Sequence, residues 1–346
     1  MRNPALNMTL KALLPVAIGL AVTAWLFNDE FKSGAFMSIE WTWRMIAGFA
    51  LAWLFMLGRD FGLAWRFHTI AQPTLSWGRA WRVDFMCAFT SAITPSAVGG
   101  SAFAIFYLNR EGVRLGRATT MTLTTLFLDE LFFVVFCPVI LLFLPLDRLF
   151  GGAGVDAAFM DGVQLVFWLV YAGIVVWTAI LFMGIIVRPQ AVASAIKRLF
   201  MIRWLARWRR GAFDTANNMV AASRELRHCP RRWWLNVFGA TVLSWFSRYL
   251  IVNALFWGFA PEASWLLVFG RQFVVWVVLM VSPTPGGSGI SEWLFATYYG
   301  DLLPDPSLAL VLALTWRLVS YYIYLFVGSL LLPSYFSTKK KTPIPT

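Results

Sequence analysis

Long apolar runs separated by short polar segments dominate the pattern of this chain, which has 346 residues. A bilayer core about 30 Å thick requires roughly 20 apolar residues per helix. The apolar runs therefore predict six membrane-spanning helices, of which the second is shorter than this length. These helices are expected to cover approximately residues 10–27, 43–57, 118–144, 165–187, 233–259 and 307–332.

Two further apolar segments, 83–109 and 263–300, are interrupted at their centres by residues that break helices. Proline lacks a backbone N–H and glycine turns freely, so neither interruption favours a continuous helix. The breaks contain Thr94, Pro95, Gly99 and Gly100 in the first segment and Pro283, Pro285, Gly286, Gly287 and Gly289 in the second. One interpretation is that proline and glycine only kink two long helices, which membrane helices tolerate.

The charges that flank the two segments favour a different interpretation, in which each is a re-entrant hairpin. Basic residues flank 83–109 on both sides, and acidic residues flank 263–300 on both sides. Each segment is thus expected to enter the membrane and return on one side, the first on the inside and the second on the outside. Because lipid cannot satisfy the backbone groups that a break frees, both breaks should point into the protein.

The spacing of these features predicts an inverted repeat within a single integral membrane domain, residues 1–346. The two Thr-Pro pairs are 190 residues apart, and the same offset places the second and third spans approximately on the fifth and sixth. The expected halves are residues 1–144 and 165–332. The predicted fold is an all-α polytopic membrane protein with about six long helices and two re-entrant hairpins. Paired interrupted segments in inverted halves are typical of the central site of a transporter.

Composition and charge support this prediction and give it a direction. The chain is 59% hydrophobic and only 13% charged, with a mean hydropathy of +0.67. Its net charge of +12 does not indicate nucleic-acid binding, because the basic residues lie in short segments between apolar runs. The loop 188–232 is strongly basic, and the tail 333–346 carries three consecutive lysines. Both termini and this loop are therefore predicted to be cytoplasmic, in a multi-pass protein of a bacterial inner membrane.

Ionisable residues inside the predicted spans are the candidate site, because each costs on the order of 3 kcal/mol at the bilayer centre. The candidate substrate-binding residues are Arg248, Arg271, Arg317, Glu292, Asp129 and Glu130. The repeat offset predicts that Arg317 pairs with Asp129 or Glu130, and the hairpin arms predict that Arg271 meets Glu292. Arg248 either holds an anionic headgroup or pairs with Asp84. All of these charges could instead serve only to fix helix packing.

The same residues carry a resemblance to a known family. Thr94-Pro95 with Gly99-Gly100 and the acidic pair Asp129-Glu130, and Pro283 to Gly289 with Glu292 and Arg317, resemble the lysylphosphatidylglycerol synthase transmembrane family. That family includes the flippase half of the bacterial multiple peptide resistance factor, so the resemblance implies lipid transport. Since the sequence ends shortly after the sixth predicted span, we expect it to lack the cytosolic aminoacyltransferase domain of the full-length factor and not to synthesise lysyl-lipid.

The expected function is translocation of an anionic, aminoacylated or glycosylated lipid between leaflets, with membrane lipids as partners. Without a nucleotide-binding motif, transport would be passive or coupled to ions, with Asp129, Glu130 or Glu292 as candidate proton carriers. The alternatives are a membrane-embedded transferase and a scaffold for lipid or glycolipid synthesis, with a homo-oligomer or a synthesis enzyme as partner. Neither a cofactor nor a metal is expected, because three scattered cysteines and two histidines form no cluster in the sequence.

Overall fold

The computed structural model describes residues 41–94, 98–151, 157–202, 204, 209–284, 286–305 and 308–337. Throughout this part of the chain the regular structure is helical, without strands, and five helices are long and apolar enough to cross a membrane. The all-α polytopic fold is therefore confirmed. The predicted first span 10–27, the lysines of the tail, Pro95 and Pro285 lie outside the described residues.

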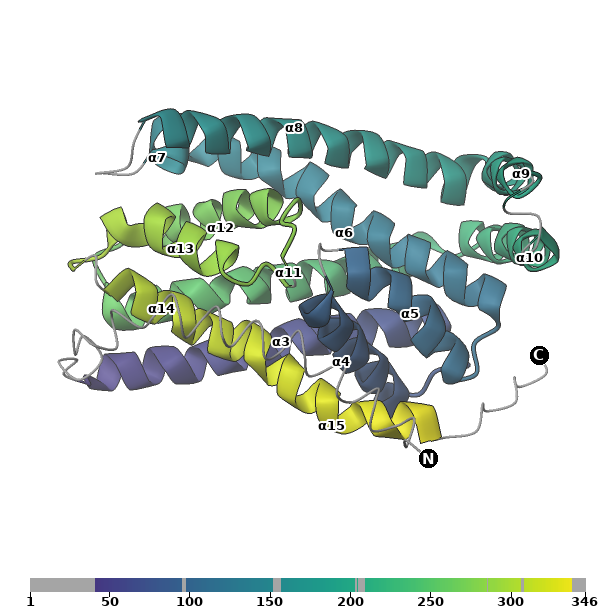
Figure 1. Cartoon of the computed structure of the whole chain (residues 1–346), viewed down its shortest axis with the longest axis horizontal. Helices are drawn as coiled ribbons and strands as arrows, with labels where there is room; N and C mark the ends of the chain where they lie inside the picture. The colour runs from purple at the N-terminus through teal and green to yellow at the C-terminus, as the bar shows by residue number, and fades with distance from the viewer. Residues whose placement is uncertain are drawn as a thin grey trace.

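The five long helical segments lie side by side along the longest axis of the molecule (Figure 1). The last of them contains a π-helical turn, Leu318–Tyr322, and α8 ends in another, Met183–Val187. The helices of these segments are α3 (Trp43–Ala71), α6 (Leu115–Phe143), α8 (Ala157–Phe182), α11 (Arg231–Phe259), α14 (Leu308–Arg317) and α15 (Ile323–Ser337). A short helix, α7 (Leu146–Phe150), precedes α8.

Helix α3 is much longer than the predicted span 43–57, because it continues to Ala71. Its second half contains Arg59, Asp60 and Arg66, which shorten the apolar run and made the helix look short. These charged side chains are nevertheless buried against neighbouring helices. Close backbone contact makes that burial possible: a Cβ on Gly62 would lie 2.7 Å from the carbonyl oxygen of Ala240 in α11.

Both interrupted segments fold as pairs of short helices that pack against each other, so the kinked-helix alternative is wrong. The first pair is α4 (Trp77–Ile93) and α5 (Val98–Arg110), and the second is α12 (Trp265–Leu279) and α13 (Ile290–Tyr299). The second pair lies at the end of the bundle near α7, and the first pair lies towards the opposite end (Figure 1). The same order of elements occurs twice along the chain: a long helix is followed by a pair of short helices and then by another long helical segment.

The breaks of the two hairpins meet inside the bundle. The backbone N–H of Gly286 donates to the carbonyl oxygen of Thr94 at 3.2 Å. The hydroxyl of Tyr321, in the last π-helical turn, donates to the carbonyl oxygen of Ala92 at 3.0 Å. Carbonyl groups at the first break are thus satisfied by the second hairpin and by the last long segment, which lipid could not do.

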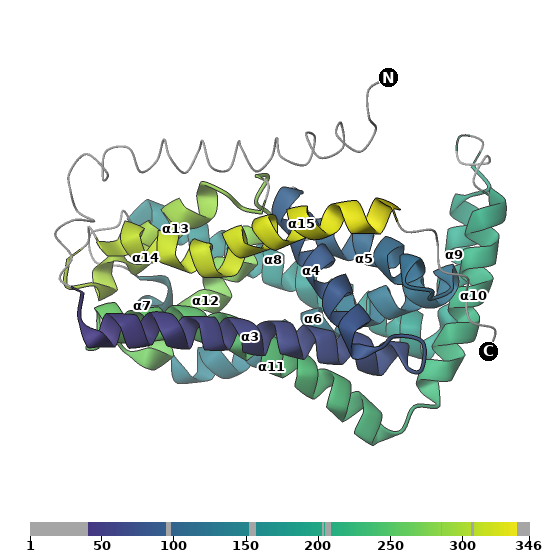
Figure 2. The ribbon, with the colours of Figure 1, turned by 90° about the horizontal axis from the view of Figure 1, so that it is seen from below.

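The basic loop 188–232 is folded into two helices, α9 (Pro189–Leu199) and α10 (Arg209–Arg227). They run across the end of the bundle, nearly at right angles to the long helices (Figure 2). Helix α10 packs against both α9 and α6.

Candidate functional site

A cavity of about 280 Å³ lies where the two hairpins meet. Residues of both breaks border it, including Ala92 at the end of α4 and Gly286 and Gly287 after α12. The remaining lining comes from the long helices α3, α6, α11 and the α14–α15 segment. Both hairpins and four of the long helical segments thus contribute to one internal site.

Helix α3 supplies one wall of the cavity through a single face. Met56, Arg59, Leu63 and Arg66 all line it, and their spacing of three or four residues keeps them on one side of an α-helix. Arg59 and Arg66 line the cavity but were not among the predicted site residues, because they follow the short apolar run and looked like a cytoplasmic boundary. Their spacing of seven residues, two helical turns, is the sequence signal that relates them.

Three arginines of the cavity are held by carboxylates. Arg59 pairs with Asp60 at 2.7 Å, and Arg66 pairs with Asp129 through two hydrogen bonds of 2.6 and 3.0 Å. The hydroxyl of Tyr324 also donates to Asp60 at 2.5 Å. Buried charges of this kind are tolerated in a membrane when they are paired and hydrogen-bonded.

The third pair joins Arg317 to Glu292, with 2.8 Å between Nε of the arginine and Oε1 of the acid. The guanidinium also donates to the carbonyl oxygen of Gly286 at 3.0 Å. Arg317 therefore holds the break of the second hairpin. The predicted pairing of Arg317 with Asp129 or Glu130 is wrong, because equal depth in two halves does not place side chains on facing sides of their helices.

Arg271 does not line the cavity. It pairs with Asp301, with 2.8 Å between Nη2 and Oδ2, and its other nitrogen donates to the carbonyl oxygen of Tyr298 at 2.7 Å. A further bond reaches the carbonyl oxygen of Gly151 at 2.5 Å. The predicted pairing of Arg271 with Glu292 is therefore wrong, because Glu292 pairs with Arg317 at the end of α14. Arg271 instead connects the base of the second hairpin, where α12 starts and α13 ends, to the segment before α8.

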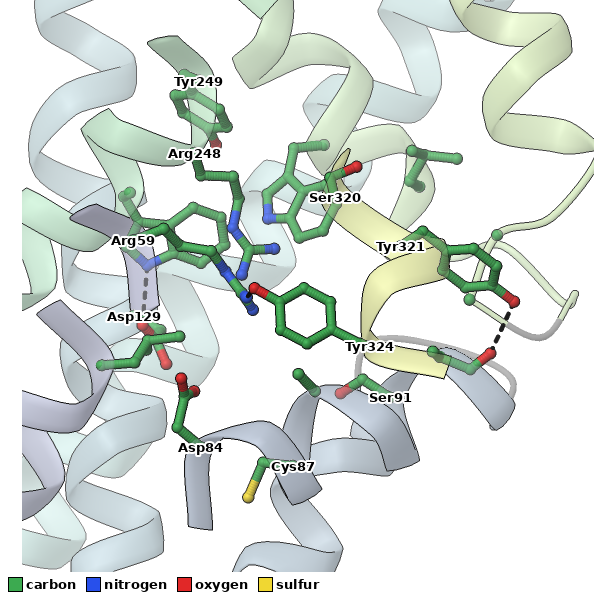
Figure 3. A pocket seen from close by; sticks show the side chains of 18 of the residues that line it. Arg59, Asp84, Cys87, Ser91, Asp129, Arg248, Tyr249, Ser320, Tyr321 and Tyr324 are labelled. Atoms are coloured by element: carbon green, nitrogen blue, oxygen red, sulfur yellow. Dashed lines mark hydrogen bonds between the residues drawn. The ribbon is translucent and has the colours of Figure 1, made fainter. Parts of the chain in front are cut away.

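Three charged side chains of the cavity make no ion pair with any residue of the described part of the chain: Arg248, Asp84 and Glu130. Nε of Arg248 and one oxygen of each acid are buried without a hydrogen-bond partner. The alternative that Arg248 pairs with Asp84 is therefore not what the structure shows. Arg248 and Asp84 enter the cavity from opposite sides (Figure 3).

Two indole rings hold Arg248 in place. Its guanidinium carbon lies 4.8 Å from the ring centroid of Trp245 and 4.7 Å from that of Trp276. Cation–π contacts of this kind are worth about 0.5–2 kcal/mol each and leave the donors at the edge of the guanidinium unused. Arg248 is thus positioned by aromatic contacts and still able to bind an anion.

The other predicted site residues divide between this cavity and its surroundings. Asp129, Glu130, Arg248 and Arg317 line the cavity, whereas Glu292 lies behind Arg317. Within the described ranges no group of three or more His, Cys, Asp and Glu side chains is placed to hold a metal ion. The side chains that line the cavity offer charges, hydrogen-bonding groups and aromatic rings to a ligand.

Comparison with known proteins agrees with this architecture. Residues 12–328 match the family described as the lysylphosphatidylglycerol synthase TM region. The chain is 24% identical over 331 residues to a UPF0104 membrane protein of Archaeoglobus fulgidus, covering 92% of this chain and 95% of that protein. No solved structure matches the chain. With the family match extending over both hairpins and the cavity between them, the chain belongs to the lysylphosphatidylglycerol synthase transmembrane family.

Proposed function

We propose that this protein translocates a membrane lipid between leaflets by holding its headgroup in the central cavity. The observation that carries the proposal is a cavity at the meeting point of two broken hairpins, lined by charges without ion-pair partners. Charged groups inside a membrane are costly and mark substrate or ion pathways. Sites formed by interrupted helices of two repeats are typical of transporters.

The size of the cavity supports a headgroup as the part of the lipid that enters. Its volume of about 280 Å³ lies near the lower end of ligand pockets, which span roughly 300–1,000 Å³. A polar headgroup fits such a space, whereas two acyl chains do not. The acyl chains would remain in the bilayer while the headgroup crosses.

The unpaired charges favour a headgroup that carries both signs, which narrows the expected lipid classes towards an aminoacylated or otherwise amine-bearing phospholipid. Arg248 offers a planar guanidinium, which suits a phosphate group. Asp84 and Glu130 offer carboxyl groups that suit an ammonium group. A glycosylated headgroup without an amine would leave both acids unpaired in a buried site.

A reconstituted transport assay tests this proposal. Protein in proteoliposomes would be supplied with labelled phospholipids that carry a phosphate alone, or a phosphate and an amine. Three single variants would be compared with the wild type in this assay: Arg248→Met, Asp84→Asn and Glu130→Gln. We expect Arg248→Met to reduce transport of both lipids about tenfold or more, as loss of a charge-assisted contact of 1.5–3 kcal/mol implies. Asp84→Asn and Glu130→Gln should reduce transport of the amine-bearing lipid more strongly.

Matched controls separate binding from folding. Arg44→Met and Asp161→Asn make the same chemical changes at exposed positions and should leave transport unchanged. None of the three cavity substitutions leaves an ion-pair partner behind, so the melting temperature should fall much less than after loss of one member of a buried pair. Full transport by Arg248→Met would contradict the proposal, and wild-type protein that moves no lipid of the panel would favour a scaffold.

A further inference from the structure

An apolar tip lies at the connection between α9 and α10, where a loop would ordinarily be polar. The tip consists of Leu199, Met201, Ile202 and Trp204, all exposed, with Trp204 at 89% and Met201 at 64%. It does not continue the core of the arm formed by α9 and α10. That small core contains Ala193 and Ala216, with Val192 and Ile196 packed beside them.

The position of the arm places this tip at the level of lipid headgroups. The membrane-spanning segment of α8 ends at Val187 and α9 begins at Pro189, so α9 starts at the membrane surface. At the other end, α10 stops at Arg227 and the span α11 starts at Arg231. Because both helices run nearly perpendicular to the long helices (Figure 2), the arm stays parallel to the membrane plane along its length.

Basic residues surround the apolar tip. Arg198 precedes it, and Arg209 and Arg210 follow it, all with exposed side chains. Apolar side chains with tryptophan, flanked by Lys or Arg, are the composition of segments that lie in the interface of an anionic leaflet. Basic residues near such a surface are attracted to its anionic headgroups.

We infer that the tip formed by Leu199, Met201, Ile202 and Trp204 is an interfacial anchor that inserts these apolar side chains into the anionic leaflet beside the bundle. The arm thereby fixes α10, and through it α6, relative to the membrane surface. The occupant of this surface is the lipid leaflet itself. The inference is independent of lipid transport, because it concerns a surface at the end of the bundle and not the cavity.

Depth-dependent fluorescence quenching tests the anchor in the full chain. Cys87, Cys137 and Cys229 would be replaced by alanine, and Trp204→Cys would carry an environment-sensitive fluorophore. The matched control is Ala221→Cys, an exposed position on α10 more than three turns from the start of that helix. Vesicles of phosphatidylcholine with and without phosphatidylglycerol would contain lipids with a quencher near the headgroup, and iodide would serve as the aqueous quencher.

We expect the lipid quencher to act severalfold more strongly on the label at position 204 than on the label at position 221. The difference should be larger with phosphatidylglycerol, and Arg198→Gln with Arg210→Gln should remove that increase. A label at position 204 that iodide reaches and lipid does not would overturn the inference. So would a label shielded from both quenchers, which would indicate contact with protein, such as a second copy.

Discussion

Three of the arginines inside the bundle are accommodated in three different ways. Arg317 is paired with Glu292, Arg271 is bound by Asp301 and several carbonyl oxygens, and Arg248 makes cation–π contacts with Trp245 and Trp276. Only the first two leave an unpaired carboxylate when the arginine is removed. The same substitution is therefore expected to have different effects at these positions.

Arg317→Ala should destabilise the protein strongly. It leaves Glu292, which is 0% exposed, without its cation and frees the carbonyl oxygen of Gly286. Breaking a buried pair on one side costs about 3–5 kcal/mol. The check is the melting temperature in detergent, which should be lower than that of the wild type, followed by loss of monodisperse protein.

The double substitution Arg317→Ala with Glu292→Gln provides the control for this prediction. It removes the stranded charge and should recover part of the lost stability. Because Arg248 has no carboxylate partner and loses only its contacts with two indole rings, Arg248→Met should lower the melting temperature much less than Arg317→Ala does. Equal melting temperatures for Arg317→Ala and Arg248→Met would show that the Arg317–Glu292 pair does not stabilise the fold.

Among the structural elements, the break of the second hairpin depends on backbone conformations that favour glycine. Gly286, Gly287 and Gly289 have φ of +55°, +72° and +82°, in the left-handed region. Gly286 also has no room for a side chain, since a Cβ would lie 2.3 Å from the ring of Tyr321 and 2.9 Å from the carbonyl oxygen of Ala92. The absence of a side chain there allows the two hairpins to touch.

Gly286→Ala is expected to separate the hairpins and destabilise the protein. The positive φ alone costs about 1–3 kcal/mol for a residue with a Cβ, and the steric contact adds to it. The melting temperature should fall, and the transport rate should change because the break borders the cavity. Gly300→Ala is the matched control, because Gly300 has an α-helical φ of −59° and nothing within 4 Å of its Cβ position. A similar loss from both substitutions would contradict this account.

For the whole molecule, the arm of α9 and α10 marks one end of the bundle, and the base of the second hairpin marks the other (Figures 1 and 2). The excess of Lys and Arg in the arm predicts that its end is cytoplasmic. This orientation determines which leaflet each hairpin enters from. It also determines which leaflet contacts the apolar tip.

Thiol labelling from one side of the membrane tests the orientation. In a background without native cysteines, Glu262→Cys and Arg210→Cys place thiols at exposed positions on opposite ends of the bundle. A membrane-impermeant reagent added to intact cells should modify the thiol at position 262 and reach the one at position 210 only after the membrane is opened. The reverse pattern would show that the charge-based orientation is wrong.

Much of the architecture could be predicted because it depends on local patterns. Apolar runs located four of the long segments in the described part of the chain within a few residues, and proline and glycine located both breaks. The second span was too short in the prediction because Arg59, Asp60 and Arg66 interrupt its hydropathy. Their burial depends on partners in other helices, and hydropathy along one segment does not contain that information.

The sequence alone determined that this is a helical membrane protein with two interrupted segments, since hydropathy and helix breaking are properties of neighbouring residues. It also supplied the family, through the motifs at the breaks and in the helices that follow them. The tertiary structure decided which charges meet. Arg317 pairs with Glu292, Arg66 with Asp129, and Arg248 with no acid of the described chain, because rotation about each helix axis and the choice of neighbouring helix determine which side chains face each other.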